Sequence, residues 1–141
     1  MNRELQIHKI EPVIIEPDEA TVQRLAEQAQ AADGIKPFTE SDSAWQIRLA
    51  QVKAGLYRIG LDVEAALTEE EDGVDFAVPN VTFEVRIGVE KVYEGKSDAK
   101  TGAFVARLKS NIPLENFAPS FEVVISARDG VGKLTMKVKV D

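Results

Sequence analysis

Residues 44–67 constrain the fold more than any other part of this sequence. Their apolar residues form two interleaved sets with seven-residue spacing: Trp45, Val52, Ile59 and Ala66 in one, and Leu49, Leu56 and Val63 in the other. Apolar residues separated alternately by three and four positions lie on one side of an α-helix, and this pattern continues for about three heptads. The charged and amide side chains of the stretch all lie between them. The spacing therefore predicts one long amphipathic helix, which Ser41 or Ser43 would cap.

A strand is the alternative for the second half of this stretch. Over residues 57–67 every second residue is apolar, as in a strand with one buried face. Gly55 and Gly60 also disfavour a helix, by about 1 kcal/mol each relative to alanine. We nevertheless predict a helix, because Ala, Gln, Arg, Lys and Leu dominate the stretch. The heptad pattern also extends over all of it, whereas the alternation covers only half.

Composition excludes several classes of function. The chain has 141 residues, of which 44% are hydrophobic and 29% are charged, and this is typical of one globular domain. A net charge of −7 argues against binding to nucleic acid or to anionic membranes, because both require a basic surface. There is no cysteine, which excludes disulfides, zinc–thiolate sites and thiol catalysis. Because no apolar run suits a signal peptide or a membrane span, we expect a cytoplasmic protein.

The same patterns divide the chain into an N-terminal arm, residues 1–40, and a main domain, residues 41–141. In the arm, residues 4–15 are rich in β-branched side chains and predict an edge strand. Residues 18–32 predict a helix with Asp18 as its N-terminal cap and with Val22 and Ala26 in a thin apolar stripe.

After residue 73 the apolar period changes to two, which predicts an antiparallel sheet of about four strands. Residues 81–89 alternate between apolar and polar and form the clearest predicted strand. Residues 94–102 predict a hairpin loop, and residues 104–112 predict the return strand. Asp129-Gly130 separates two further alternating runs and predicts a second hairpin. The long helix is expected to pack on the apolar face of this sheet.

No catalytic, cofactor-binding or metal-binding residue is predicted. His8 is the only histidine, and a general base needs a nucleophile or a carboxylate held against it. The acidic run at 69–72 is contiguous, so it lacks the alternate spacing of a calcium loop. Residues 95–102, GKSDAKTG, lack the order of glycine and lysine in a phosphate-binding loop. We therefore expect a protein that is not an enzyme and that has no cofactor.

The apolar seam of the predicted helix is the candidate interaction surface. It comprises Trp45, Leu49, Val52, Leu56, Ile59 and Val63. A strict heptad stripe is narrower than most globular helices need, so it suits pairing with another helix as well as packing on a sheet. Trp45, the only tryptophan, either closes one end of the core or anchors a partner. Two interpretations stay open: the seam is plain core, or it is an interface with a protein partner or a second copy in a homodimer.

A patterned strand follows the acidic turn. Its residues are Phe76, Val78, Val81, Phe83, Glu84, Val85 and Val89. A helix, an acidic turn and this strand resemble the small bacterial trypsin-co-occurring domains, and the resemblance covers residues 45–140. The chain departs from them in its N-terminal extension and in the irregular residues 111–120. The resemblance implies a non-catalytic accessory module that works beside a trypsin-like peptidase or an NTPase in bacterial conflict systems.

Together these patterns predict an α+β fold, in which a long amphipathic helix packs on an antiparallel sheet of about four strands beside an N-terminal strand/helix arm. The leading function is protein–protein interaction, as a non-catalytic accessory module of a bacterial system. One alternative is a structural subunit of a phage or secretion assembly. The other is a small-molecule binder or a carboxylate hydrolase, which would need a deep pocket and an acid of raised pKa.

Overall fold

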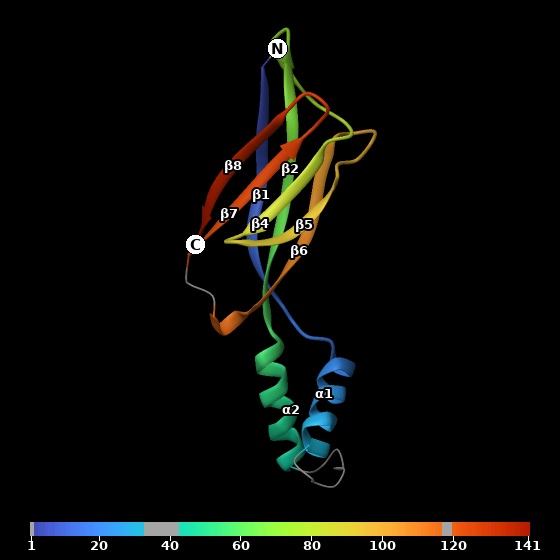
Figure 1. Cartoon of the computed structure of the whole chain (residues 1–141), viewed down its shortest axis with the longest axis vertical. Coiled ribbons are helices and arrows are strands. Elements are labelled where there is room, and N and C mark those ends of the chain that lie inside the picture. Colours follow the sequence, from blue (N-terminus) through green and yellow to red (C-terminus); the bar gives the residue numbers. More distant parts are fainter. Residues whose placement is uncertain (1, 33–42, 117–119) are drawn as a thin grey trace.

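Two antiparallel sheets pack face to face to form the body of the molecule, and a helical hairpin projects from one end of it (Figure 1). The computed structural model describes residues 2–32, 43–116 and 120–141. In chain order the elements are β1 (Arg3–Ile15), α1 (Glu19–Ala32), α2 (Ser43–Leu56), β2 (Arg58–Glu71), β3 (Val74–Ala77), β4 (Thr82–Ile87), β5 (Glu90–Lys96), β6 (Ala103–Pro113), the 3-10 helix η1 (Leu114–Asn116), β7 (Phe121–Arg128) and β8 (Lys133–Val140). The first sheet contains β1, β2, β3 and β6, and the second has the order β5-β4-β7-β8.

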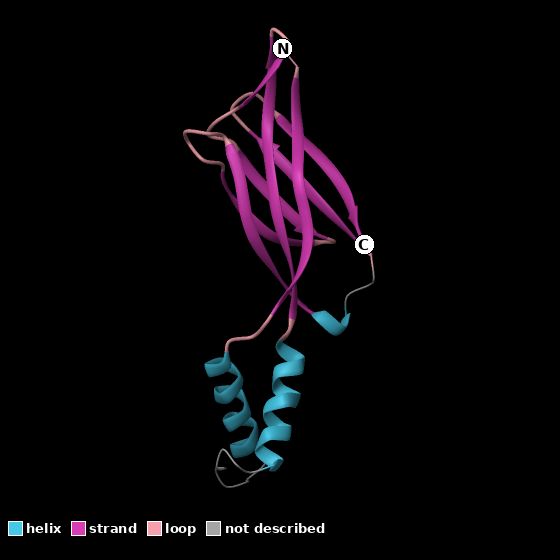
Figure 2. Cartoon of the chain, turned by 180° about the vertical axis from the view of Figure 1, so that it is seen from behind, coloured by secondary structure: helices cyan, strands magenta, loops and turns pink. Residues whose placement is uncertain are grey.

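The central strand of the first sheet is β2. Strand β1 pairs with it from Arg3 opposite Glu69 to Ile15 opposite Arg58, although both α-helices lie between these strands in the sequence. Strands β6 and β3 pair with successive parts of the other edge of β2. The helical hairpin is therefore inserted into the connection of a long β-hairpin, and Figure 2 shows β1 and β2 leading into the two helices.

The core lies between the inner faces of the two sheets. Most of its buried side chains come from β2 and β6 on one side and from β4 and β7 on the other. They include Leu61, Val63, Leu67, Phe104 and Leu108, facing Phe83, Val85, Ile87, Val123 and Ile125. Removal of these side chains from water is the main force that holds the sheets together.

The prediction of one long helix over residues 44–67, packed on a sheet, is wrong. Helix α2 ends at Leu56 and β2 begins at Arg58, so the second half of the stretch follows the alternating strand pattern. As a central strand, β2 forms hydrogen bonds on both edges and buries one face between the sheets. These tertiary contributions exceed the intrinsic helix preference of its alanine, leucine and glutamate residues.

The structure also bears on the predicted N-terminal arm and on the turn after β2. The edge strand predicted over residues 4–15 is confirmed as β1, but this strand pairs along the length of β2 and so belongs to the first sheet instead of a separate arm. The expected boundary at residue 40 lies outside the described residues. Asp72 and Gly73 have φ values of 52° and 82°, which are typical of the two-residue turn that here joins β2 to β3.

In the second half, the connections differ from the prediction more than the strands do. The strand predicted over 81–89 ends at Ile87, and Gly88, with a φ of 59°, turns the chain into β5. The predicted hairpin loop at 94–102 begins within β5 and leads into the other sheet, because β6 pairs with β2. The hairpin around Asp129-Gly130 is confirmed, with β7 and β8 paired along their whole length.

Gly60 lies in β2 between two close neighbours. A Cβ atom on Gly60 would lie 2.5 Å from Cδ1 of Ile15 and 2.6 Å from the carbonyl oxygen of Leu108. The alanine methyl would overpack this site, so we expect Gly60→Ala to lower the free energy of unfolding by about 1–3 kcal/mol. Urea denaturation of the variant and the parent protein measures this difference.

Gly55→Ala is the matched control, because a Cβ atom there would have no heavy atom within 4 Å. Gly55 is in α2, where alanine is preferred to glycine by about 1 kcal/mol. This variant should therefore unfold at the parental urea concentration or slightly above it. A loss of stability as large as that of Gly60→Ala would contradict the steric explanation.

Candidate interaction surface

The helical hairpin begins with a capped helix. The Asp18 carboxylate accepts hydrogen bonds from the backbone N–H and the hydroxyl of Thr21, both at 3.2 Å, as the sequence predicts. The cap sets the first turn of α1 directly after β1 ends, so it helps to fix the direction in which α1 leaves the sheet.

The two helices pack mainly against each other. Val22 and Ala26 of α1 and Trp45 of α2 are buried, and Leu49 is partly buried. Toward the body, α2 also contacts η1. Each helix has 14 residues, a length at which an isolated helix is only marginally stable in water, so both depend on this packing.

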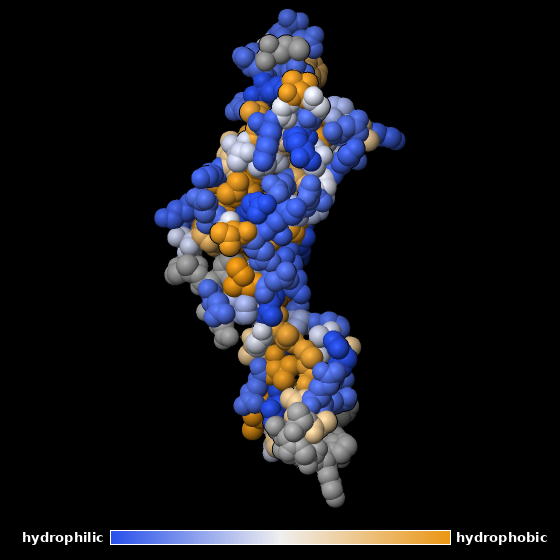
Figure 3. Space-filling view, in the orientation of Figure 1, coloured by the Kyte–Doolittle hydropathy of each residue, from blue (hydrophilic) through white to orange (hydrophobic). Residues whose placement is uncertain are grey.

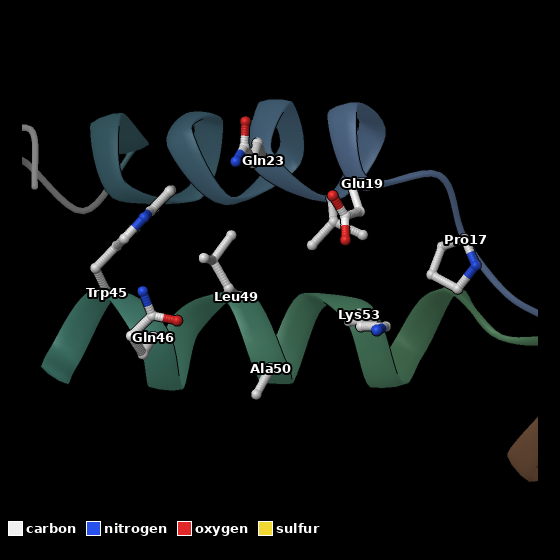
Figure 4. Close-up of a pocket in the computed structure, with 9 residues that line it drawn as sticks. Pro17, Glu19, Gln23, Trp45, Gln46, Leu49, Ala50 and Lys53 are labelled. Carbon is white, nitrogen blue, oxygen red and sulfur yellow. The ribbon is translucent and has the colours of Figure 1, made fainter. Parts of the chain in front are cut away.

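One side of the hairpin is hollowed into a groove of about 560 Å³ between the two helices (Figure 4). Its lining consists of Pro17, Glu19, Val22, Gln23, Trp45, Gln46, Leu49, Ala50 and Lys53. Figure 4 shows Trp45 and Leu49 pointing from α2 toward α1. Apolar surface on the hairpin is also visible in Figure 3. The groove therefore has an apolar floor between two polar rims.

The rims of this groove carry opposite charges at the same level. Glu19 is exposed in the first turn of α1, and Lys53 is in the last turn of α2. Because the helices are antiparallel, both lie at the end of the hairpin nearest the sheets, and Figure 4 shows them level with each other. Gln23 is level with Ala50 farther from the sheets. The surface thus combines an apolar strip with one acidic and one basic edge.

The structure separates the residues of the predicted interaction surface. Trp45, Leu49, Val52 and Leu56 are in α2, but Ile59 and Val63 are in β2, where they are only 8% and 1% exposed. The seam is therefore not one continuous surface. Trp45 and Leu49 line the groove, whereas Val52 and Leu56 do not.

The α1 half of the groove is absent from the predicted surface. Glu19, Val22 and Gln23 line it from that side. The apolar stripe containing Val22 and Ala26 indicates that α1 packs on something, but its partner is separated from it in the sequence. Only the antiparallel pairing of α1 with α2 makes these residues part of one surface.

Charged groups elsewhere form structural contacts. On the first sheet, Arg107 donates to both carboxylate oxygens of Asp62 at 2.7 and 2.9 Å, and these hydrogen bonds hold the pKa of Asp62 below its ordinary value. On the second sheet, the hydrogen bond from Lys91 similarly lowers the pKa of Glu94. Each of these two carboxylates is therefore stabilised in its ionised form by a neighbouring cation.

Other residues considered in the sequence also have defined positions. His8 lies at an irregularity in the pairing of β1 with β2, between Ile7 and Lys9. Within residues 2–32, 43–116 and 120–141, no group of three or more His, Asp or Glu side chains is placed to hold a metal ion. None of the described helices is both long and apolar enough to cross a membrane.

No family model, curated protein or solved structure matches this chain. The resemblance to trypsin-co-occurring domains therefore stays a prediction. Of its residues, Phe83 and Val85 are buried in β4, whereas Val89 is 95% exposed in the turn before β5.

Proposed function

We propose that this chain is a non-catalytic protein–protein interaction module whose helical hairpin binds an amphipathic α-helix. The groove between α1 and α2 is the observation that carries this proposal. Its floor contains Val22, Trp45 and Leu49, and its rims contain polar and charged side chains of both signs. A helix with an apolar stripe and polar flanks matches that arrangement, as in other cases of helix-in-groove recognition.

The energetics of the hairpin favour the same conclusion. Two short helices bury only the residues at their mutual contact, and in the groove Leu49 stays partly exposed beside the buried Val22 and Trp45. A third or fourth helix would remove this apolar surface from water, with a gain of about 25 cal/mol per Å². Antiparallel helix pairs become well-packed units when they are part of a bundle.

A site-specific photo-crosslinker tests the proposal in cells that produce the protein. Replacing Gln23, on the groove rim, with benzoylphenylalanine should give light-dependent adducts. The adduct peptides, identified by mass spectrometry, should come from an amphipathic helical segment. The binding energy resides in the groove, so the attachment sites should cluster along one face of that segment.

The matched control is the same replacement at Gln28. This glutamine is also exposed on α1, but it does not line the groove. Five positions separate it from Gln23, so the two side chains leave the helix in widely different directions. Absence of adducts from position 23, or equal yields from both positions, would reject the hairpin groove as the binding element.

A structural subunit of a larger assembly is the second candidate function, and the shape of the molecule favours it. At the end opposite the hairpin, β3 carries Val74 and Phe76, which are 52% and 55% exposed (Figure 1). An assembly subunit would use both ends of the molecule. An assembly subunit should crosslink to neighbours from both position 76 and position 23. A simple binding module should crosslink only from position 23.

A further inference from the structure

We infer that the helical segment that fills the groove is the hairpin of a second copy of this chain. This inference rests on the proposed function of the hairpin. The two hairpins would face each other across a two-fold axis that runs parallel to their helices. The result is a four-helix bundle with the two sandwich bodies at the same end.

The geometry of a two-fold axis explains why the groove of one copy is complementary to the groove of a second copy. Rotation about an axis parallel to the helices places α1 of one copy opposite α2 of the other. Each residue keeps its height along the axis, so residues at the same level on the two rims meet across the interface. Such an interface is isologous, and every contact in it occurs twice.

Charge complementarity is the first argument for this occupant. Glu19 and Lys53 are level with each other on opposite rims (Figure 4). In the two-fold arrangement, Glu19 of each copy faces Lys53 of the other, which gives two ion pairs. A hairpin whose rims carried like charges at this level would repel its own copy.

Shape complementarity is the second argument. Gln23 is level with Ala50, so the longer side chain of one rim faces a methyl group of the other copy (Figure 4). A small residue at this position allows the helices to approach closely. Leu49, which is only partly buried within one copy, then lies near the centre of the bundle beside the already buried Trp45.

Charge reversal and sedimentation velocity over a concentration series test the inference. The parent protein should dimerise. Glu19→Lys and Lys53→Glu should each raise the dimer dissociation constant by roughly 10- to 100-fold, because each replaces two attractive contacts with two repulsive ones. Arg24→Glu is the control, since it reverses an exposed charge on α1 that does not line the groove and that lies about 100° around the helix from Gln23, so it should leave the constant within a few-fold of the parent.

An equimolar mixture of the Glu19→Lys and Lys53→Glu variants provides the decisive measurement. In the mixed dimer, the lysine introduced at position 19 would face the glutamate introduced at position 53. The native Lys53 of the first variant would likewise face the native Glu19 of the second, so the mixture should dimerise nearly as well as the parent. A change of stability within each hairpin cannot produce this rescue. A parent protein that stays monomeric, or a mixture that fails to associate, would overturn the inference.

The outcomes also separate this inference from the proposed function. A monomeric parent that still crosslinks from position 23 to the helix of another protein would reject the second copy and leave the binding groove supported. Absence of any adduct at position 23, together with a dimer insensitive to the charge reversals, would reject both.

Discussion

Phe83→Ala is expected to lower the free energy of unfolding by about 3–5 kcal/mol. Phe83 is fully buried in β4, and its ring stacks on that of Phe104 in β6, with centroids 4.7 Å apart and an interplanar angle of 13°. This contact joins the two sheets across the core. Alanine would leave a cavity there and would also remove the stacking, which is worth about 0.5–1.5 kcal/mol in aromatic pairs. Urea denaturation followed by circular dichroism measures the loss.

Phe76→Ala is the matched control for this prediction. Phe76 is 55% exposed on β3, outside the contact between the sheets, so its removal should change stability by less than about 0.5 kcal/mol. Single domains are typically stable by about 5–15 kcal/mol, so the two variants should differ visibly in their transition midpoints. Equal midpoints would contradict a core centred between β4 and β6.

The elements that the sequence predicts correctly depend on local signals. Asp18 caps α1 through bonds to a residue three positions away, and Asp129-Gly130 turns β7 directly into β8. Such signals are complete within a few residues. Residues 57–67 differ, because their apolar side chains fit both a heptad and an alternating pattern. The choice between helix and strand is made by β1 and β6, which pair with β2 from distant parts of the chain.

The candidate interaction surface shows the same distinction between local signals and contacts with distant parts of the chain. Spacing within one helix identifies Trp45 and Leu49, and both line the groove. Ile59 and Val63 join them in the sequence pattern only if the helix continues past Leu56, which it does not. Glu19 and Gln23 have no spacing that relates them to α2. Their position on the opposite rim follows only from the antiparallel packing of the two helices.

Gly102→Ala should also have a large effect, with an expected loss of about 2–5 kcal/mol in the free energy of unfolding. Gly102 has a φ of 71°, and a Cβ atom there would lie 2.8 Å from the carbonyl oxygen of Val78. Alanine is strained in this conformation, and in addition it would collide with backbone, which cannot rotate away as a side chain can. Urea denaturation again provides the measurement.

The connection that contains Gly102 leaves little room for adjustment. The N–H of Gly102 donates to the carbonyl oxygen of Asp98 at 2.9 Å. The N–H of Asp98 donates to the carbonyl oxygen of Ala103, also at 2.9 Å. The Asp98 carboxylate accepts from the N–H groups of Thr101 and Lys100, both at 2.8 Å, and these bonds lower its pKa. Because this short turn carries the chain from β5 in one sheet to β6 in the other, a shift at Gly102 would disturb the packing of both.

Gly73→Ala separates the two causes of this expected loss. Gly73 also has a positive φ, 82°, but a Cβ atom there would have no heavy atom within 4 Å. Its replacement should therefore cost only the conformational strain, about 1–2 kcal/mol. The excess loss in Gly102→Ala then measures the collision with Val78. If the two variants lose the same stability, the approach of Val78 to Gly102 does not constrain the turn, and the sheets tolerate a shift of this connection.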